Sequence, residues 1–254
     1  MKTFLNCILF GDSLIDKFKI IFIIIWLNLR KRININIIKL TIRLSKNCRA
    51  ITIELSEKSD YKVFRDIFLT QEYYFEDIKK AKTIVDLGSN IGISIAYFYI
   101  QSPDSVIYAF EPNPACFDIL QKIKDQNPSR IKVFNLAVGK AGITEFFVSK
   151  QGTPASSYLK RKPDDEKILI KSINATELRS IVSNIDLLKC DIEGAEEFIL
   201  NDLADSSFVK NLIAEIHFDL IDLSSKDISN IFVNHTLKLK MLNKERGLLF
   251  SFSK

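Results

Sequence analysis

The sequence predicts an α/β fold built on a mostly parallel sheet, with a C-terminal antiparallel hairpin and a small N-terminal cap. From residue 83 onward, short β-branched runs alternate with amphipathic stretches, which is typical of parallel strands joined by helices. Two strand-like runs at 237–241 and 248–252, separated by a short polar segment, indicate the hairpin. Hydrophobic residues make up 47% and charged residues 26% of the chain, as in ordinary globular proteins. The composition therefore argues against a disordered chain and against a polytopic membrane protein.

The N-terminal fifty residues differ from the rest in charge. They hold ten Lys or Arg and only two Asp, whereas the rest of the chain holds 26 basic and 29 acidic residues, so the basic character of the chain belongs to this segment. This uneven distribution argues against a nucleic-acid-binding surface over the whole molecule. The four Cys are scattered and only two His are present, which argues against disulfides and a zinc site. We therefore expect a cytoplasmic protein, and the sequence leaves a homo-oligomer open.

An apolar run at residues 20–27 lies between basic residues. It is far shorter than the roughly 20 residues that span a bilayer, and no signal-peptide cleavage site follows it. We interpret it as a buried helix or a dimer contact. The flanking basic residues leave open a peripheral membrane contact through residues 15–32.

The remaining elements follow from the spacing of apolar residues. Alternation over 33–55 predicts the strands of the cap, and helical spacing over 60–80 predicts one or two helices before the sheet. We divide the chain into an N-terminal basic and apolar segment with a small β cap, 1–57, and a larger domain, 58–254. In that domain we expect strands at 83–87, 106–110, 131–136, 143–148, 167–173, 185–190 and 212–216, and helices at 91–100, 116–124, 176–181, 195–200 and 223–233. The polar stretch 149–166 is the longest expected loop.

The strongest local pattern is Asp-Leu-Gly-Ser-Asn-Ile-Gly at residues 86–92, where a strand enters a turn and then a helix. Gly88 and Gly92 let the backbone approach a ligand at the carboxyl end of a strand, where open α/β sheets place their sites. The closer glycine spacing of a nicotinamide site is absent. Asp86 would repel a pyrophosphate but suits a cofactor that carries a cationic amine and a sulfonium. The simpler alternative is a structural turn.

A second acidic residue, Glu111, follows the next strand in Phe-Glu-Pro-Asn-Pro at residues 110–114. A carboxylate at this strand tip can accept hydrogen bonds from both hydroxyls of a ribose. Pro114 suits the first turn of the helix that follows, and the alternative role for Glu111 is to cap that helix. Together, the two motifs favour a cofactor that contains adenosine.

Three further residues are candidates for catalysis. Asp191 and Glu193 follow the strand expected at 185–190, and His217 closes the strand expected at 212–216. Two carboxylates at a strand tip can divide the tasks of orienting a substrate and taking a proton, and the ordinary pKa of His217 suits proton removal near neutrality. A structural hydrogen bond is the alternative for His217. We assign no metal, although an oxygen-only Mg²⁺ site of Asp191, Glu193 and Glu215 stays open.

Neighbouring polar residues receive structural interpretations. We expect Glu196 and Glu197 to complement the positive end of a helix dipole. Lys189 has three alternatives: neutralising Glu193, binding an anionic substrate group, or lying partly exposed on its strand. We expect His235 in a surface loop.

In order and spacing, these segments resemble the class I S-adenosylmethionine-dependent methyltransferases, and most closely their FkbM-like family. The resemblance spans roughly residues 58–217 and rests on the segments 85–92, 110–114, 135–139, 188–196 and 215–217. It implies a Rossmann-like class I methyltransferase sheet and S-adenosylmethionine as the cofactor. Residues 1–50 lie outside it.

The resemblance also implies roles for single residues. Asp86, Gly88, Asn90 and Gly92 would surround the methionine part of the cofactor, Glu111 would bind its ribose, and Asn113 with residues 135–137, Ala137 among them, would contact its adenine. His217, Asp191 and Glu193 are the candidate catalytic residues. The implied reaction is O-methylation of a hydroxyl on a sugar, glycan or small-molecule metabolite, bound between the strand tips and the loop 149–166. The alternatives are an RNA methyltransferase that uses the basic N-terminal arm and a non-catalytic membrane-associated binding protein.

Overall fold

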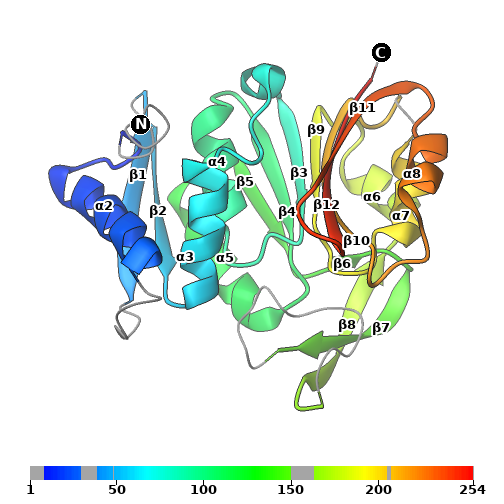
Figure 1. Cartoon of the computed structure of the whole chain (residues 1–254), viewed down its shortest axis with the longest axis horizontal. Helices are drawn as coiled ribbons and strands as arrows, with labels where there is room; N and C mark the ends of the chain where they lie inside the picture. Colours follow the sequence, from blue (N-terminus) through cyan, green and yellow to red (C-terminus); the bar gives the residue numbers. More distant parts are fainter. Residues whose placement is uncertain (1–8, 30–38, 48, 150–162, 205–206, 254) are drawn as a thin grey trace.

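The structure, a computed structural model of the chain, describes residues 9–29, 39–47, 49–149, 163–204 and 207–253 (Figure 1). The strand expected near residues 33–37 and most of the loop 149–166 lie outside these ranges. The site and its supporting elements lie within them.

A seven-stranded sheet forms the centre of the molecule, with the strand order β11-β12-β10-β9-β3-β4-β5. Strands β5, β4, β3, β9 and β10 are mutually parallel, whereas β12 runs antiparallel to both of its neighbours. The strands are β3 (Thr83–Leu87), β4 (Val106–Phe110), β5 (Ile131–Phe134), β9 (Leu187–Cys190), β10 (Asn211–His217), β11 (His235–Met241) and β12 (Arg246–Ser253). This confirms the predicted class I sheet with its C-terminal antiparallel hairpin.

Helices cover both faces of this sheet, so its central strands are buried on both sides, as is usual for parallel sheets (Figure 1). One hydrophobic cluster, which includes Phe98 and Leu120, lies under α4 and α5, and a second, which includes Leu178 and Ile199, lies under α6, α7 and α8. The helices are α4 (Ile93–Gln101), α5 (Pro114–Gln126), α6 (Ala175–Ile181), α7 (Glu197–Leu203) and α8 (Ser225–Ile231). The side chain of Asn113 caps α5 by accepting a hydrogen bond from the Ala115 amide.

The N-terminal elements pack against the α4 side of the molecule. They are α2 (Leu14–Leu29), the antiparallel hairpin β1 (Leu40–Lys46) and β2 (Arg49–Leu55), α3 (Lys58–Phe64), η1 (Arg65–Leu69) and η2 (Glu76–Lys80). Ile20, Ile42 and Ile53 from these elements share one hydrophobic cluster with Ile84 of the sheet. The predicted strand-containing cap is therefore present, and the division at residue 57 stays a prediction. Within the described ranges, no helix is long and apolar enough to cross a membrane.

A second, three-stranded sheet lies beside the carboxyl ends of the parallel strands (Figure 1). It has the order β6-β8-β7 and consists of β6 (Ala137–Val138), β7 (Gly142–Val148) and β8 (Glu166–Ile173). The two strand-like segments expected at 143–148 and 167–173 thus pair with each other. The small sheet places Val138 of β6 and Phe146 of β7 in the wall of the site described below.

The prediction of a surface loop at His235 is wrong. His235 is buried and is the first residue of β11. Its Nδ1 lies 2.8 Å from the Ser251 hydroxyl, and its Nε2 lies 3.2 Å from the Ala204 carbonyl oxygen. Because α8 already ends at Ile231, the polar residues after it enter the sheet edge instead of forming a loop.

Candidate active site

An open cavity lies where the parallel strands end, which is where open α/β sheets place their binding sites. The turn after β3 forms its floor, and β4, β9 and the small sheet add further walls. Two residues of the segment before the sheet, Asp60 and Tyr73, complete the lining together with apolar neighbours. Among the residues predicted for the site, those lining this cavity are Gly88, Asn90, Glu111, Ala137, Asp191 and Glu193.

The turn after β3 uses left-handed backbone at three positions, with φ of 74° at Gly88, 49° at Asn90 and 85° at Gly92. A Cβ at Gly88 would collide with the carbonyl oxygen of Asp191, so only glycine allows β9 to approach the turn. Gly92 begins α4 and faces Ile123 of α5, away from the cavity. The turn thus brings backbone N–H and carbonyl groups to the cavity floor.

We expect Gly88→Ala to lower the free energy of unfolding by more than about 3 kcal/mol, because it adds a collision to an unfavourable left-handed φ. Gly142→Ala is the matched control: its φ is 119°, but a Cβ there meets nothing within 4 Å. The control should lose only the backbone contribution of about 1–2 kcal/mol in urea unfolding. Equal losses in the two variants would contradict a collision at Gly88.

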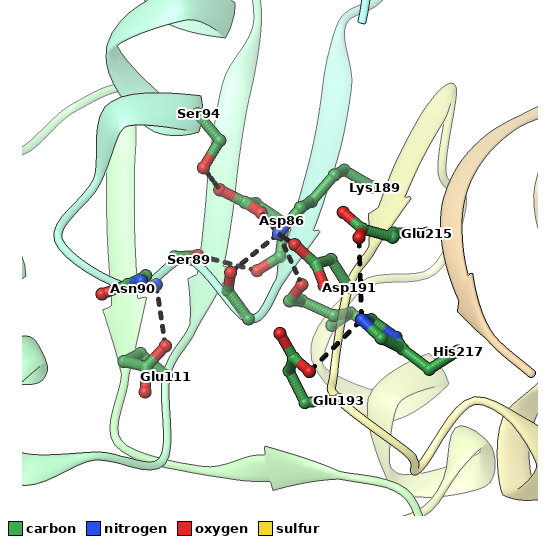
Figure 2. A network of polar contacts seen from close by, with 12 residues as sticks. Asp86, Ser89, Asn90, Ser94, Glu111, Lys189, Asp191, Glu193, Glu215 and His217 are labelled. Carbon is green, nitrogen blue, oxygen red and sulfur yellow. Dashed lines mark hydrogen bonds and ion pairs between the residues drawn. The ribbon is translucent and has the colours of Figure 1, made fainter. Parts of the chain in front are cut away.

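Glu111 lies at the tip of β4 with its carboxylate against the glycine turn (Figure 2). Its Oε2 accepts a hydrogen bond from the Asn90 amide at 2.7 Å, and its Oε1 accepts one from the Asn113 amide at 2.9 Å. Burial raises the pKa of Glu111 to about 7, although these two hydrogen bonds act in the opposite direction. Each carboxylate oxygen keeps a further lone pair for a ligand.

The raised pKa of Glu111 predicts that the ligand-free protein loses stability as the pH rises. The folded protein holds this proton up to about pH 7, whereas the unfolded chain releases it near 4.5, the ordinary pKa of a glutamate. The contribution is therefore fully present below pH 4.5 and declines by up to about 3 kcal/mol as the pH reaches 7. Urea unfolding of Glu111→Gln should lack this part of the decline. An unchanged difference between the two proteins from pH 5 to 8 would contradict it.

Asp86 and Lys189 are directly opposite each other in the pairing of β3 with β9. The Lys189 ammonium lies 3.3 Å from Asp86 Oδ1 and donates hydrogen bonds to the carbonyls of Leu87 and Gly88. Ser94 donates a 2.6 Å hydrogen bond to the other Asp86 oxygen (Figure 2). Asp86 is fully buried and lies beneath the cavity floor, outside its lining. Of the alternatives for Lys189, partial exposure is wrong, because only 3% of the residue is accessible.

The tips of β9 and β10 bring together the carboxylate–histidine cluster, defined as Asp191, Glu193, Glu215 and His217 (Figure 2). His217 Nε2 lies 3.2 Å from Glu193 Oε2 and 3.7 Å from Glu215 Oε1. His217 is fully buried behind Glu193 and does not line the cavity. Glu193 has a left-handed φ of 52°, which turns the chain at the end of β9.

The charges in this cluster shift several pKa values. Burial lowers the pKa of His217, but the hydrogen bond with Glu196 and the charge of Glu193 outweigh it and raise that pKa to about 9. Burial and the neighbouring Asp191 raise the pKa of Glu215 to about 7. Burial also opposes the charge of Lys189, whose pKa is nevertheless raised because Asp86 and Asp191 stabilise the ammonium. Imidazolium and ammonium groups thus offset part of the negative charge.

Glu196 lies directly before α7, where it was predicted to complement the helix dipole, and its side chain has a further partner in His217. Its side chain is fully buried and turns back from the start of α7 towards His217. One carboxylate oxygen lies 2.9 Å from His217 Nδ1, and the other accepts a hydrogen bond from the Gly194 amide at 2.8 Å. The sequence at the start of α7 does not reveal this contact, because the histidine comes from β10.

Four sequence-predicted residues support the site from outside the cavity lining: Asp86, Gly92, Asn113 and His217. Sequence reasoning did not assign Asp60 and Tyr73 to the site, although both line the cavity. Asp60 accepts backbone hydrogen bonds from Ser56 and Glu57, and its other oxygen is buried without a hydrogen-bond partner. No local signal marks these residues, since they reach the site through the packing of α3 and the segment after it.

Comparison with known proteins agrees with this geometry. The model of the methyltransferase FkbM domain matches residues 86–232. Methyltransferase 1 of Beauveria bassiana is 26% identical over 183 residues, which cover 63% of this chain and 70% of that protein. The hexuronic acid methyltransferase AglP of Haloferax volcanii is 26% identical over 175 residues, 67% of this chain and 70% of that protein.

Among solved structures, methyltransferase FkbM from Methylobacillus flagellatus KT superimposes with a TM-score of 0.48 and 17% sequence identity. The superposition covers 74% of this chain and 48% of that one. The family match covers more than half of the present chain and includes the glycine turn, Glu111 and the carboxylate–histidine cluster. The chain belongs to the FkbM family of methyltransferases.

Proposed function

We propose that this protein transfers a methyl group from S-adenosylmethionine to an oxygen atom of a sugar, glycan or small-molecule metabolite. The observation that carries the proposal is that one cavity has two chemically different sides. Glu111 and the glycine turn lie on one side, and Asp191 with Glu193 lie on the other. A nucleoside is suited to the first side and a hydroxylated acceptor to the second.

The residues around the glycine turn fit the cofactor. Both Glu111 oxygens are already oriented by backbone amides, so their remaining lone pairs can accept the two ribose hydroxyls. Ala137 and the neighbouring apolar side chains offer a surface for a flat base. When bound, S-adenosylmethionine supplies an electrophilic methyl group on a sulfonium. The nearby carboxylates suit its positive charge.

Asp86 would act on the cofactor indirectly. Its carboxylate is paired with Lys189, which in turn holds the carbonyl groups of Leu87 and Gly88. We therefore propose that Asp86 positions the cavity floor and that the backbone of the turn contacts the methionine part. Gly92 and Asn113 would support the same floor through α4 and α5.

On the acceptor side, Asp191 and Glu193 can reach a bound hydroxyl because both line the cavity. The acceptor oxygen forms a bond to the methyl carbon while the carbon–sulfur bond breaks, and the hydroxyl proton passes to one of these carboxylates. His217 is protonated near neutral pH in the ligand-free protein and lies behind Glu193, so it would orient the carboxylate. Most of the acceleration would come from alignment of the two reactants.

Isothermal titration with S-adenosylmethionine, followed by a screen of uronic acids, glycosides and other hydroxylated acceptors with methyl-labelled cofactor, tests the proposal. We expect heat release on cofactor binding and transfer to at least one acceptor. Glu193→Gln should abolish most transfer while cofactor binding persists. Glu197→Gln, a neighbouring control outside the cavity lining, should retain transfer. Absence of cofactor binding by the folded protein would overturn the proposed function.

A further inference from the structure

We propose that Asp191, Glu193 and His217 form a binding site for a divalent metal ion beside the methyl-transfer cavity. One ligand atom from each residue can be chosen so that all three lie within 4.8 Å of one another. Donor atoms around a single cation at about 2.1 Å are about 3–4 Å apart, so small rotations of the carboxylates close the set. The three residues come from the tips of two adjacent strands, β9 and β10.

The orientation of His217 is the second observation. The residue is 0% exposed, and its Nε2 is buried without a hydrogen-bond partner while it faces Glu193 and Glu215. Its other nitrogen, Nδ1, lies 2.9 Å from Glu196. Metal-binding histidines usually donate this second N–H to a carboxylate, which fixes the ring and leaves the opposite nitrogen for the metal. In His217, Nδ1 faces the Glu196 carboxylate and Nε2 is left for a metal ion.

Glu196 also fixes the position of a second proposed ligand, Glu193. The carboxylate oxygen that does not face His217 accepts a hydrogen bond from the Gly194 amide at 2.8 Å. Gly194 has a φ of 103° and directly follows Glu193, whose φ is 52°. One fully buried carboxylate therefore holds the imidazole and the strained turn that carries Glu193. Such a construction fits a site in which both ligands need fixed positions.

The charge around the cluster favours a cation. Five carboxylates gather here among the described residues, against the cationic side chains of Lys189 and Arg246 and the imidazolium of His217: Asp86, Asp191, Glu193, Glu196 and Glu215. Asp191 Oδ1 is buried without a hydrogen-bond partner. Glu215 is already held by Arg246 at 3.2 Å, so we place it outside the ligand set. A divalent cation would offset the excess negative charge and would be coordinated by the buried atoms Asp191 Oδ1 and His217 Nε2.

Two carboxylates and one imidazole favour Mn²⁺ or Zn²⁺ over Mg²⁺ or Ca²⁺, which prefer oxygen ligands alone. Three protein ligands leave further coordination positions towards the cavity. If the proposed methyl transfer holds, these positions take two neighbouring oxygens of the acceptor, such as a vicinal diol or a hydroxy-carboxylate. The cation would then offset the repulsion between an anionic acceptor and the carboxylates.

Titration of the chelator-treated full-length protein with Mn²⁺ or Zn²⁺, followed by calorimetry and by the electron paramagnetic resonance signal of Mn²⁺, tests the site. We expect one saturable site whose affinity falls more than about 100-fold in Glu193→Gln and in Asp191→Asn. Glu196→Gln should weaken it by about 10–100-fold through its hold on His217. Glu197→Gln should bind as the parent does. Circular dichroism checks that each variant is folded.

Absence of saturable binding by the parent protein, or equal binding by folded Glu193→Gln, would overturn the metal site. Cofactor titration in the presence of chelator separates the two proposals. If S-adenosylmethionine binds and neither metal does, only the metal site fails. If metal binds and the cofactor does not, the proposed function fails and the site stands.

The outer face of α2 supports a second proposal: we infer that it lies on an anionic membrane surface. One side of the helix buries Ile20, Ile23 and Trp26 in the core. On the other side, Ile15 is 68% and Phe18 is 67% exposed, and the remaining exposed apolar residues of the helix are Leu14, Phe22 and Ile25. In Figure 1, α2 forms the outer edge of the molecule, opposite the C-terminal strands.

The basic residues around α2 favour a lipid surface over a second copy of the chain as the partner of its outer face. Lys17 is partly exposed on α2, and the sequence continues after the helix into Arg-Lys-Arg at residues 30–32. The first fifty residues carry ten basic and two acidic side chains, so two copies would bring like charges together. An anionic lipid surface would attract the same charges while taking up the apolar side chains.

Sedimentation with vesicles of 30% phosphatidylserine in phosphatidylcholine tests this contact. We expect the protein to bind them, to bind pure phosphatidylcholine at least about tenfold more weakly, and to dissociate as salt is added. Ile15→Gln should weaken binding, whereas Ile143→Gln, at a residue 71% exposed on β7, should not. Equal effects of the two substitutions, or an Ile15-dependent dimer in light scattering without vesicle binding, would overturn the proposal.

Discussion

Lys189→Met is expected to lower the free energy of unfolding by about 3–5 kcal/mol, because it removes one partner of a buried ion pair. The ammonium lies within 4 Å of Asp86 and Asp191 and holds two carbonyls of the glycine turn. Methionine fills most of the volume but leaves the Asp86 charge uncompensated. Urea unfolding at constant pH measures the loss.

Lys132→Met is the control, because Lys132 is also a lysine of the central sheet but is exposed and bonds only the Pro128 carbonyl. It should lose less than about 1 kcal/mol. Adding Asp86→Asn to Lys189→Met should cost less than the sum of the single substitutions, since the two side chains interact directly. Additive losses, or a loss below about 1 kcal/mol for Lys189→Met, would contradict the pairing of these residues.

Glu111→Gln is expected to reduce the affinity for S-adenosylmethionine by about 100-fold or more, because it would remove the two charge-assisted hydrogen bonds that we propose between Glu111 and the ribose. In the parent protein, affinity should fall as the pH decreases through about 7, since protonation of Glu111 neutralises the acceptor. Calorimetric titration at pH 6 and pH 8 measures both effects. The variant should show a weaker pH dependence than the parent.

The exposed residue Glu145 provides the control for this substitution, because it pairs with Lys167 on the small sheet. Glu145→Gln should keep both the affinity and its pH dependence. Unfolding curves of Glu111→Gln are needed alongside, since the amide accepts from only one of the two backbone groups that now bond Glu111. A parent-like pH dependence in folded Glu111→Gln would assign the titration to another group.

The sheet and the main polar cluster were predictable from sequence, because the carboxyl ends of parallel strands lie at one edge of a sheet. This rule alone brings Asp191 and Glu193 towards His217, and it places Glu111 beside the glycine turn. The alternating pattern also predicted the terminal hairpin. Its strands are β11 and β12, and the latter inserts between β10 and β11.

Side-chain environments inside the sheet were not predictable in the same way. Lys189 belongs to a strand in which all four residues are buried, so alternation does not indicate which side chain reaches solvent. Glu196 is paired with His217, a residue 21 positions away at the end of β10, and helical spacing does not reveal such a long-range partner. His235 was misplaced because polar residues after a helix are as compatible with an edge strand as with a loop.

Part of the cavity wall comes from Asp60 and Tyr73, which precede residues 86–232. The groups proposed to hold the cofactor and those proposed to catalyse transfer all lie within that matched range. One cavity is thus assembled from two separate stretches of the chain, so substitutions at Asp60 or Tyr73 change its wall without replacing any of the groups proposed for methyl transfer.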